Sequence, residues 1–555
     1  MKTHPQESNR IRKRLKRIWH FIGHHNAFVI ALELAISAGI VLALAAPKIT
    51  NNEQYRSITP KQWRSEVMPS GSYGAGNEQP NSNERLTINN QQSGNRSSIE
   101  QHEPVEVISK RTRTSKTHDL GNGKFAWDGS IAPMHYRDAE GNFQDIHTEL
   151  VPSSRSITGF GNPAWEMIEN EYEMFVLGEL NSGVPLVRYV SKNTEYWVQF
   201  AAHNLQWTND LDQIAFIATP VTTTTEVSGN EAKWPDAYGM GIDLRFLAGL
   251  GRMNKWLDIA TPLPAPPQFI IDGGNPVIEF AEILEFHKDL EVWLNGAEWD
   301  KKSEVGAATE IEFRSSDGQV QFVFPVATGF DESKLGVPFT GELCLKKQGP
   351  NLYVTVRFPW SWLESALYPI HLDTTVAKQV GVGGDDGYRS GATGFDTSQP
   401  ICDAGDCNGP CHIFARWTGV TISGTINTAY IQVYYAYSTG DPSYLKIYGV
   451  DEDNPAAPIT YSEFEADPLT SAAIDWDGNW SGGWNTTEEL KTIFQELVDS
   501  YTISDKAVMC QIRDDGTSGD FSECRSYEWP GNIYGPKLHI EYSEAAAKRR
   551  IMIIE

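Results

Sequence analysis

Residues 27–46, AFVIALELAISAGIVLALAA, form a run of twenty residues whose single charge is Glu33. An α-helix of about 20 apolar residues is long enough to cross a lipid bilayer. Six basic residues lie within eight positions just before this run: Arg10, Arg12, Lys13, Arg14, Lys16 and Arg17. Because basic flanks stay on the cytoplasmic side, we expect residues 1–26 in the cytoplasm and the bulk of the chain in an extracellular or periplasmic space.

The same apolar run leaves a second interpretation open. Ala43, Leu44 and Ala45 fit the small-residue site at which a signal peptide is cleaved. The run is longer than the roughly 7–15 apolar residues of most signal peptides, which favours an uncleaved transmembrane anchor. In either case the segment predicts export of the residues that follow it.

Residues 47–104 are rich in Asn, Gln, Ser, Gly and Glu and show almost no apolar periodicity. A segment of this composition cannot bury enough apolar surface to fold, so we expect a disordered stalk. The short tail at 544–555 follows the last predicted strand and is expected to fray.

The net charge of the chain is −26, from 46 basic and 72 acidic residues. A chain this acidic repels other polyanions, which argues against nucleic acid as a partner. Aromatic residues make up 11% of the sequence, including 17 tryptophans. This aromatic content favours β structure with real cores.

Short alternating runs separated by turn residues begin after Pro104 and predict an all-β fold of two or three β-sandwich-like domains. Residues 105–374 form one or two of these domains, with predicted strands at 105–109, 195–201, 309–313, 320–326 and 353–358. Residues 375–543 form the last domain. In TAYIQVYYAY, the side chains of Ala429, Ile431, Val433 and Tyr435 share one strand face.

One helix is predicted to interrupt the last domain. In TTEELKTIFQELV, Thr486 and Glu489 have the spacing of a capping box. The apolar residues that follow have helical spacing: Leu490, Ile493, Phe494, Leu497 and Val498. The helix is therefore expected to pack across one end or face of the sandwich.

The order of these features resembles a known family. FARWTGVTISGTINTAYIQVYYA, LKIYGVDEDNP, the tryptophan segment, the helix, VMCQIRDDG and SYEWPGNIYGPKLHIEY together resemble the DNRLRE-type β-sandwich, an exported module grouped with carbohydrate-binding modules. Residues 111–150 and 362–375 resemble the leader that precedes such modules in wall-associated and Rhs-like surface proteins, although Asp373-Thr374-Thr375 replaces the usual Asp-Pro-Thr. The resemblance implies binding and display, and it assigns no site residue.

Six cysteines in an exported chain permit disulfides. Cys510 and Cys524 flank a predicted hairpin and are candidates for one bridge. Cys402, Cys407 and Cys411 lie in a compact loop next to His412, for which a local disulfide with one leftover thiol is favoured over a zinc site. Cys344 is expected to be a small buried residue.

The segment AIDWDGNWSGGWNTT contains Trp476, Trp480 and Trp484. Glycines between them argue against one regular strand, so we expect a loop. Trp476 is assigned to packing, whereas Trp480 and Trp484 are predicted to be exposed and to stack on a sugar. Tyr527 and Trp529 form a second candidate ligand-binding patch, for which packing is the stronger interpretation.

No catalytic motif was found, so the chain is not predicted to be an enzyme. Acidic pairs such as Asp475 and Asp477 occur by chance in a chain this acidic. Four aspartates are candidates for a structural calcium site: Asp385, Asp386, Asp451 and Asp453.

These observations predict a membrane-anchored, exported surface protein that binds polysaccharide or a neighbouring envelope component. The alternative is a structural subunit of a virion or surface appendage, which would form stable trimers or fibres. A polysaccharide-active enzyme is the third hypothesis.

Overall fold

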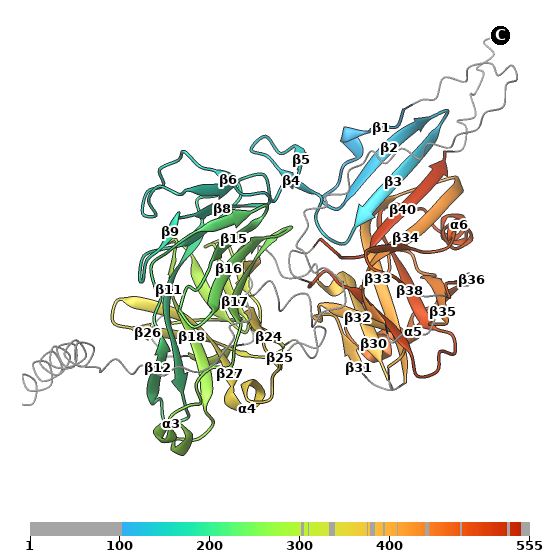
Figure 1. Cartoon of the computed structure of the whole chain (residues 1–555). Helices are drawn as coiled ribbons and strands as arrows, with labels where there is room; N and C mark the ends of the chain where they lie inside the picture. Colours follow the sequence, from blue (N-terminus) through green and yellow to red (C-terminus); the bar gives the residue numbers. More distant parts are fainter. Residues whose placement is uncertain are drawn as a thin grey trace, which may run out of the picture. The chain divides into compact units, whose positions relative to one another are not determined.

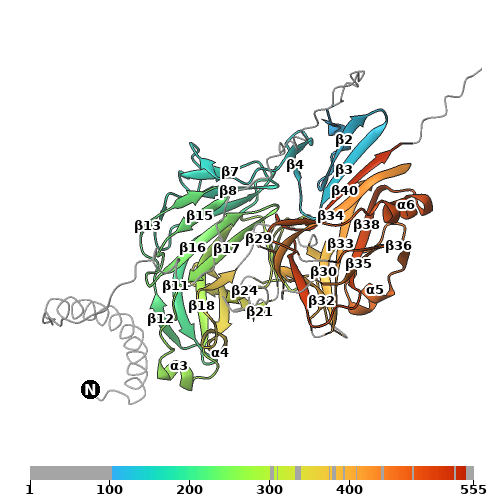
Figure 2. The ribbon, with the colours of Figure 1, turned by 45° about the vertical axis from the view of Figure 1, so that its right-hand side comes forward.

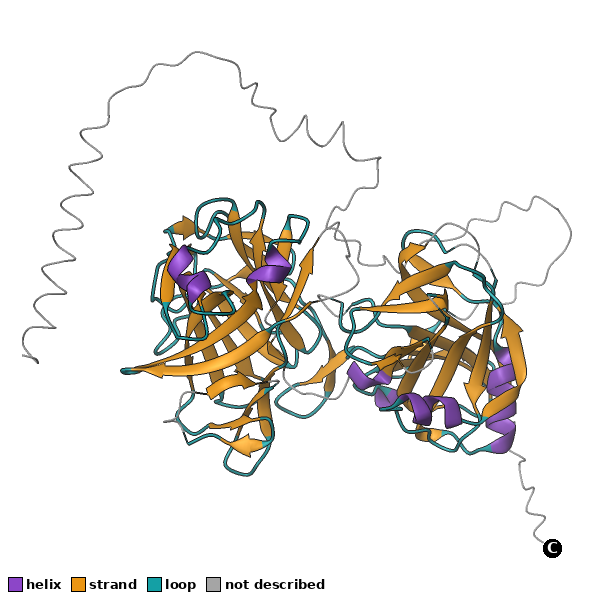
Figure 3. Ribbon diagram, turned by 90° about the horizontal axis from the view of Figure 1, so that it is seen from below, coloured by secondary structure: helices purple, strands orange, loops and turns teal. Residues whose placement is uncertain are grey.

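The computed structural model describes residues 103–544, except 301–304, 309, 332–338, 374–375, 378–382, 392–393, 408, 439–442, 478–479 and 530–532. Strands dominate these residues and the helices are short (Figure 3). The predicted all-β class is therefore confirmed. No helix within the described part of the chain is long and apolar enough to cross a membrane. The predicted anchor at 27–46 and residues 47–102 of the predicted stalk lie outside that part.

Two lobes contain the described strands. The N-terminal lobe is a sandwich of two large antiparallel sheets. Its first sheet comprises, in spatial order, β21 (Val305–Ala308), β26 (Glu342–Gln348), β27 (Asn351–Pro359), β18 (Val277–Phe286), β11 (Trp197–Thr208), β10 (Val187–Ser191), β8 (Tyr172–Val176), β7 (Trp165–Met167) and β6 (Val151–Pro152), with β12 (Ile214–Ala218) beside β11.

The second sheet of this lobe comprises β14 (Glu226–Ser228), β15 (Glu231–Trp234), β16 (Ile242–Ala248), β17 (Arg252–Ile259), β29 (Val376–Ala377), β23 (Val320–Phe324), β22 (Ile311–Arg314), β19 (Glu291–Leu294) and β20 (Ala297–Glu298), with β24 (Thr328–Asp331), β25 (Phe339–Thr340) and β28 (Ile370–Asp373) off this path. The lobe also contains the small pair of β9 (Glu179–Leu180) with β13 (Thr223–Thr224) and two short helices, α3 (Gln268–Asp272) and α4 (Trp360–Leu363). A separate pair, β4 (His135–Arg137) with β5 (Phe143–Asp145), forms ion pairs from Asp145 to Arg111 and Lys116. Phe200, Phe246, Phe313 and Phe322 are among the aromatic residues buried between the two large sheets of the lobe.

The C-terminal lobe is one curled sheet. Its order is β1 (Val105–Glu106), β2 (Ser115–Gly121), β3 (Lys124–Ser130), β40 (Lys537–Ser543), β34 (Thr425–Ser438), β39 (Phe521–Arg525), β32 (Ile401–Asp406), β33 (Pro410–Thr421), β38 (Ser504–Asp514), β35 (Leu445–Val450) and β36 (Leu469–Asp475). Three further strands pair beside this path: β30 (Asp386–Ser390), β31 (Gly394–Asp396) and β37 (Trp484–Thr486). The 3-10 turns Ile108–Lys110 and Gly383–Asp385 lie next to β1 and β30.

The N-terminal hairpin β2–β3 belongs to the C-terminal sheet (Figures 1 and 2). Asn122 and Gly123 both have positive φ, as a tight hairpin turn requires. Strand β3 then pairs with β40 along its whole length, from Lys124 opposite Ser543 to Ser130 opposite Lys537. Residues 105–130, which the sequence analysis assigned to the first region, thus join two distant parts of the chain in one sheet.

Helix α6 (Lys491–Ser500) packs on β34 and β36 with Ile493, Phe494 and Leu497 buried. The predicted apolar face is confirmed, but the predicted capping box is wrong. The helix begins at Lys491, and Thr486 ends strand β37. Thr460 caps a second helix in this lobe, α5 (Tyr461–Ala466), by accepting from the backbone N–H of Glu463 at 3.2 Å.

Candidate functional site

Strand β34 of the C-terminal lobe has one buried face and one outer face. Ala429, Ile431 and Val433 are fully buried in the core, which confirms the predicted alternation. The intervening side chains of Tyr430, Gln432 and Tyr434 are partly exposed. The neighbours of Tyr434 across the sheet are Trp484 on β37 and Arg525 on β39.

Six partly exposed side chains gather around this point, and we refer to them as the aromatic–cation face: Tyr434, Trp484, Arg525, Trp529, Tyr534 and Lys537. The ring of Tyr434 lies 5.4 Å from that of Trp484, edge to face, and 4.2 Å from that of Tyr534. The guanidinium of Arg525 lies 4.1 to 4.8 Å from the rings of Trp529, Tyr534 and Tyr434. The face is therefore a continuous surface of rings held together by a cation.

Lys537 adds a second cation to this face. Its ammonium nitrogen lies 3.9 Å from the centre of the Trp484 ring, and burial lowers the pKa of Lys537 to about 8. Among the described residues, no carboxylate forms a salt bridge with Lys537. In a chain with a net charge of −26, a cation without an acidic partner marks a place that can attract a negatively charged group.

Two carboxylates stand on the same outer face as Arg525. Glu523 precedes Arg525 by two positions on β39, and Asp403 on β32 lies directly opposite Glu523. Burial raises the pKa of Asp403 to about 6, and burial together with the charge of Asp403 raises the pKa of Glu523 to about 7. Like charges directly opposite each other weaken a sheet, so this pairing has a structural cost.

Only part of this face was predictable from the sequence. Trp484 and Trp529 were predicted ligand-binding residues, and both lie in it. Alternation along FSECR places Glu523 and Arg525 on the same strand face, and this signal could have identified both charged residues. Tyr534 lies between β39 and β40, and Lys537 begins β40 opposite Gln432, a pairing across the sheet that no local pattern shows.

Trp480 and Tyr527 do not belong to the face: the predicted exposure of Trp480 is wrong, and Tyr527 is buried, as the packing interpretation of its segment expected. Trp480 is 5% exposed and its ring lies 4.8 Å from that of Trp476, inside the core. The packing role predicted for Trp476 is confirmed. Tyr527 is 6% exposed, and its backbone N–H donates to Asp386 at 2.8 Å.

The cysteines form a different pattern from the one predicted. Cys407 and Cys411 form a disulfide, as the local-bridge interpretation of that loop expected, and Cys402 is a buried free thiol. Cys510 and Cys524 are also free and buried, so the predicted bridge between them is wrong. Strands β38 and β39 are separated in the sheet by β32 and β33, and Cys524 lies opposite Cys402. Cys344 is buried, as predicted.

The four calcium candidates do not meet. Asp385 pairs with Arg416 at 2.5 Å and Asp453 with Lys506 at 2.5 Å, so these two carboxylates are neutralised by side chains. Within the described part of the chain, one group of three possible metal ligands occurs, Asp403 with Cys407 and Cys411, and it includes none of the four. Both sulfurs in that group belong to the disulfide.

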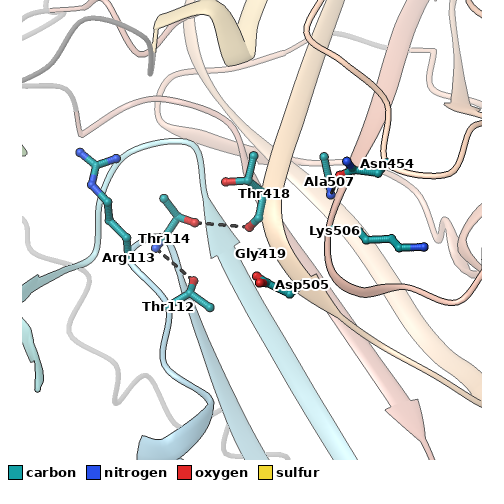
Figure 4. A pocket seen from close by; sticks show the side chains of 9 residues that line it. All are labelled: Thr112, Arg113, Thr114, Thr418, Gly419, Asn454, Asp505, Lys506 and Ala507. Carbon is teal, nitrogen blue, oxygen red and sulfur yellow. Dashed lines mark hydrogen bonds between the residues drawn. The ribbon is translucent and has the colours of Figure 1, made fainter.

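A pocket of about 350 Å³ lies elsewhere in this lobe (Figure 4). Residues 112–114 line one side of it, and Thr418, Gly419, Asp505 and Lys506 line the other. The hydroxyl of Thr114 donates to the carbonyl of Thr418 at 3.4 Å across it. No aromatic ring lines this pocket, and Lys506 is paired with Asp453. We therefore interpret it as a packing gap between the segment that precedes β2 and the rest of the sheet, and not as a ligand site.

Comparison with known proteins identifies no family. No family model matches this chain, and no curated protein matches it. The resemblance to the DNRLRE-type module therefore stays a prediction.

Several solved structures match at low similarity. An exo-β-1,3-galactanase from Phanerochaete chrysosporium with bound β-1,3-galactotriose is 9% identical, with 77% of this chain and 95% of that chain covered and a TM-score of 0.14. The N-terminal domain of a Streptococcus gordonii adhesin is 7% identical, with 80% and 98% covered and a TM-score of 0.13. TM-scores this low carry no argument about the fold or function of this chain.

Proposed function

We propose that this protein is an exported surface protein that binds polysaccharide through the aromatic–cation face of its C-terminal lobe, with residues 27–46 as its membrane anchor. The observation that carries the proposal is the cluster of four aromatic rings and two cations on one outer sheet face. Aromatic rings offer flat apolar surfaces to the C–H side of a sugar ring, and neighbouring polar groups bind its hydroxyls.

The two cations narrow the class of glycan. Burial against Trp484 disfavours the charge of Lys537, as its pKa of about 8 indicates. A carboxylate or another anionic group on the ligand would restore the stability of that charge. The proposed ligand is therefore a polysaccharide that carries negatively charged substituents, with its sugar rings on the aromatic residues.

Binding of the purified chain to an array of acidic and neutral glycans tests the proposal. Trp484→Ala and Trp529→Ala should each weaken binding at least tenfold, a loss of about 1.4 kcal/mol, because a ring at the centre of a contact carries much of its energy. Lys537→Gln should weaken acidic glycans more than neutral ones, and added salt should reduce that difference.

Trp293 provides a matched control. It is a partly exposed tryptophan on β19 of the N-terminal lobe, with the guanidinium of Arg314 4.2 Å from its ring. Trp293→Ala should leave glycan binding unchanged. Equal losses for Trp293→Ala and Trp484→Ala would contradict the assignment of the face.

The carboxylate pair favours a second candidate function, hydrolysis of the bound polysaccharide. Asp403 and Glu523 lie directly opposite each other on neighbouring antiparallel strands, and retaining glycosidases use two neighbouring carboxyl groups, one of them protonated. The raised pKa values of Asp403 and Glu523 suit the protonated role. New reducing ends from a bound glycan, lost in Glu523→Gln while binding remains, would establish hydrolysis.

The alternative of a virion or appendage subunit makes a different prediction about assembly. A structural subunit forms stable trimers or fibres, whereas an anchored binding protein can act as a monomer. The mass of the purified chain in solution separates the two functions.

A further inference from the structure

A lysine and a glutamate meet in the core of the N-terminal lobe. Lys255 lies on β17 and Glu282 on β18, in the two different sheets of the sandwich. Each side chain is 2% exposed, and the ammonium of Lys255 donates directly to Oε2 of Glu282. The pair therefore bridges the sheets at a site closed to solvent.

The surroundings of this pair are apolar. On β17, the neighbours that point the same way as Lys255 are Met253 and Leu257, and both are fully buried. Phe280 and Leu284 flank Glu282 in the same manner on β18. The rings of Phe200 and Phe280 lie 4.7 and 5.9 Å from the Lys255 nitrogen. Two charges in such surroundings lose their hydration, and one contact between them replaces it poorly.

The hydrogen bonding of the pair is incomplete. An ammonium group has three N–H donors, and within the described part of the chain Glu282 is the one acceptor for Lys255. Oε1 of Glu282 is buried without a hydrogen-bond partner. Burial also raises the pKa of Glu282. These surroundings favour an uncharged pair over two buried charges, because neither group keeps its hydration.

We propose that Lys255 and Glu282 condense to form an isopeptide bond that links the two sheets of the N-terminal lobe. The lone pair of Nζ attacks Cδ of the carboxylic acid, and the Nζ–Cδ bond forms. The Cδ–O bond to the hydroxyl then breaks, and the departing oxygen takes a proton from Nζ and leaves as water. No electrons are transferred to or from the pair, and the product is a neutral amide where two charges stood.

Tyr238 is a positioning residue for this step. Its hydroxyl is buried without a hydrogen-bond partner, and its ring lies edge to face with Phe280 at 5.9 Å. Burial and, after it, the charge of Glu282 raise the pKa of Tyr238, so the phenol stays protonated. A phenol O–H can donate to the carboxyl oxygen as negative charge develops on it.

Mass spectrometry of the full chain tests the proposal directly. After reduction and alkylation of the cysteines, the denatured protein should weigh one water molecule less than the mass calculated for its alkylated sequence, counted from its measured N-terminus. Proteolysis should yield a branched fragment that joins the peptide containing Lys255 to the peptide containing Glu282. The full sequence mass, or separate unmodified peptides for the two residues, would overturn the proposal without any variant.

Three variants test which lysine forms the bond and whether Tyr238 promotes its formation. Lys255→Met should restore the full mass, and Lys192→Met, which removes a lysine paired with Glu173 at 3.3 Å in the same lobe, should not. Tyr238→Phe keeps the ring against Phe280 and should increase the fraction of unlinked chains soon after synthesis, with an unchanged fold by circular dichroism. Unlinked fractions equal to those of the unaltered chain would remove Tyr238 from the step.

Discussion

The two lobes share an all-β architecture, but buried polar networks of the N-terminal lobe and the aromatic–cation face of the C-terminal lobe differ in exposure. In the N-terminal lobe, Arg188 donates to Gln199 at 2.7 Å and Gln206 donates to Glu279 at 2.7 Å, with these four side chains 1 to 7% exposed. The C-terminal lobe leaves its aromatic–cation face partly exposed. Covered polar groups rigidify a sandwich, whereas exposed rings and cations remain available to a ligand. The proposed recognition therefore depends on the exposed face of the C-terminal lobe and not on the buried networks of the N-terminal lobe.

Removal of the buried ring of Trp127 is expected to have the largest effect on stability and to destabilise one lobe without the other. Trp127 on β3 is 1% exposed in the core of the C-terminal lobe. Trp127→Ala should destabilise that lobe by about 3–5 kcal/mol, because a large cavity would remain. Hydrogen exchange followed peptide by peptide should show lost protection in β34 and β40, with β11 and β18 unchanged.

Lys124→Ala is the control for this experiment, since Lys124 is an exposed residue at the start of the same strand. It should change stability by no more than about 0.5 kcal/mol. Loss of protection confined to β2 and β3 in Trp127→Ala would show that the hairpin is an appendage and not a part of the C-terminal core.

The tryptophan segment gives the next largest effect and distinguishes packing from recognition within one lobe. Trp480→Ala should cost about 3 kcal/mol of unfolding free energy, because the Trp480 side chain is 5% exposed against Trp476. Trp484→Ala should cost less than about 1 kcal/mol, because Trp484 is partly exposed. Urea denaturation measures both. Equal costs for the two variants would place Trp484 in the core and would remove it from the ligand face.

Local patterns predicted the strands and the buried side of α6 because alternation and helical spacing are properties of neighbouring residues. Which strands pair is decided elsewhere in the chain. Trp127 and Ile540 lie opposite each other in β3 and β40 although more than 400 positions separate them. No periodicity within either strand contains that information, so the hairpin was assigned to the wrong region.

The same limit explains the errors at single residues. Thr486 and Glu489 have the spacing of a capping box, but Thr486 pairs with Gln432 in the sheet and Glu489 accepts from the backbone N–H of Ala429 at 2.7 Å. A true Thr-x-x-Glu signal stood at Thr460 and Glu463 and was missed. Competition from tertiary partners decides which of two equal local signals forms a cap.

The smallest effect, a difference in pH dependence, sharpens the comparison between the lobes. Raised pKa values of Asp403 and Glu523 mean that the folded C-terminal lobe keeps protons that the unfolded chain releases from about pH 4 upward. Its stability should therefore fall as the pH rises from about 4 to about 7. Asp258 in the N-terminal lobe behaves oppositely, because hydrogen bonds from His371 and Arg245 outweigh burial and lower its pKa. The contribution of Asp258 to the stability of the N-terminal lobe is therefore lost as the pH falls.

Glu523→Gln tests this difference. The variant removes one of two like charges, so it should be more stable than the unaltered chain at pH 8 by about 0.5–1 kcal/mol. At pH 4.5, where Glu523 is protonated in the folded lobe, the difference should vanish. Glu488→Gln, which removes an exposed carboxylate near α6, should leave the pH profile parallel to that of the unaltered chain. A Glu523→Gln variant that is less stable at pH 8 would mean that a cation or hydrogen-bond donor stabilises the charged pair, and that Asp403 and Glu523 cannot supply the protonated acid that hydrolysis needs.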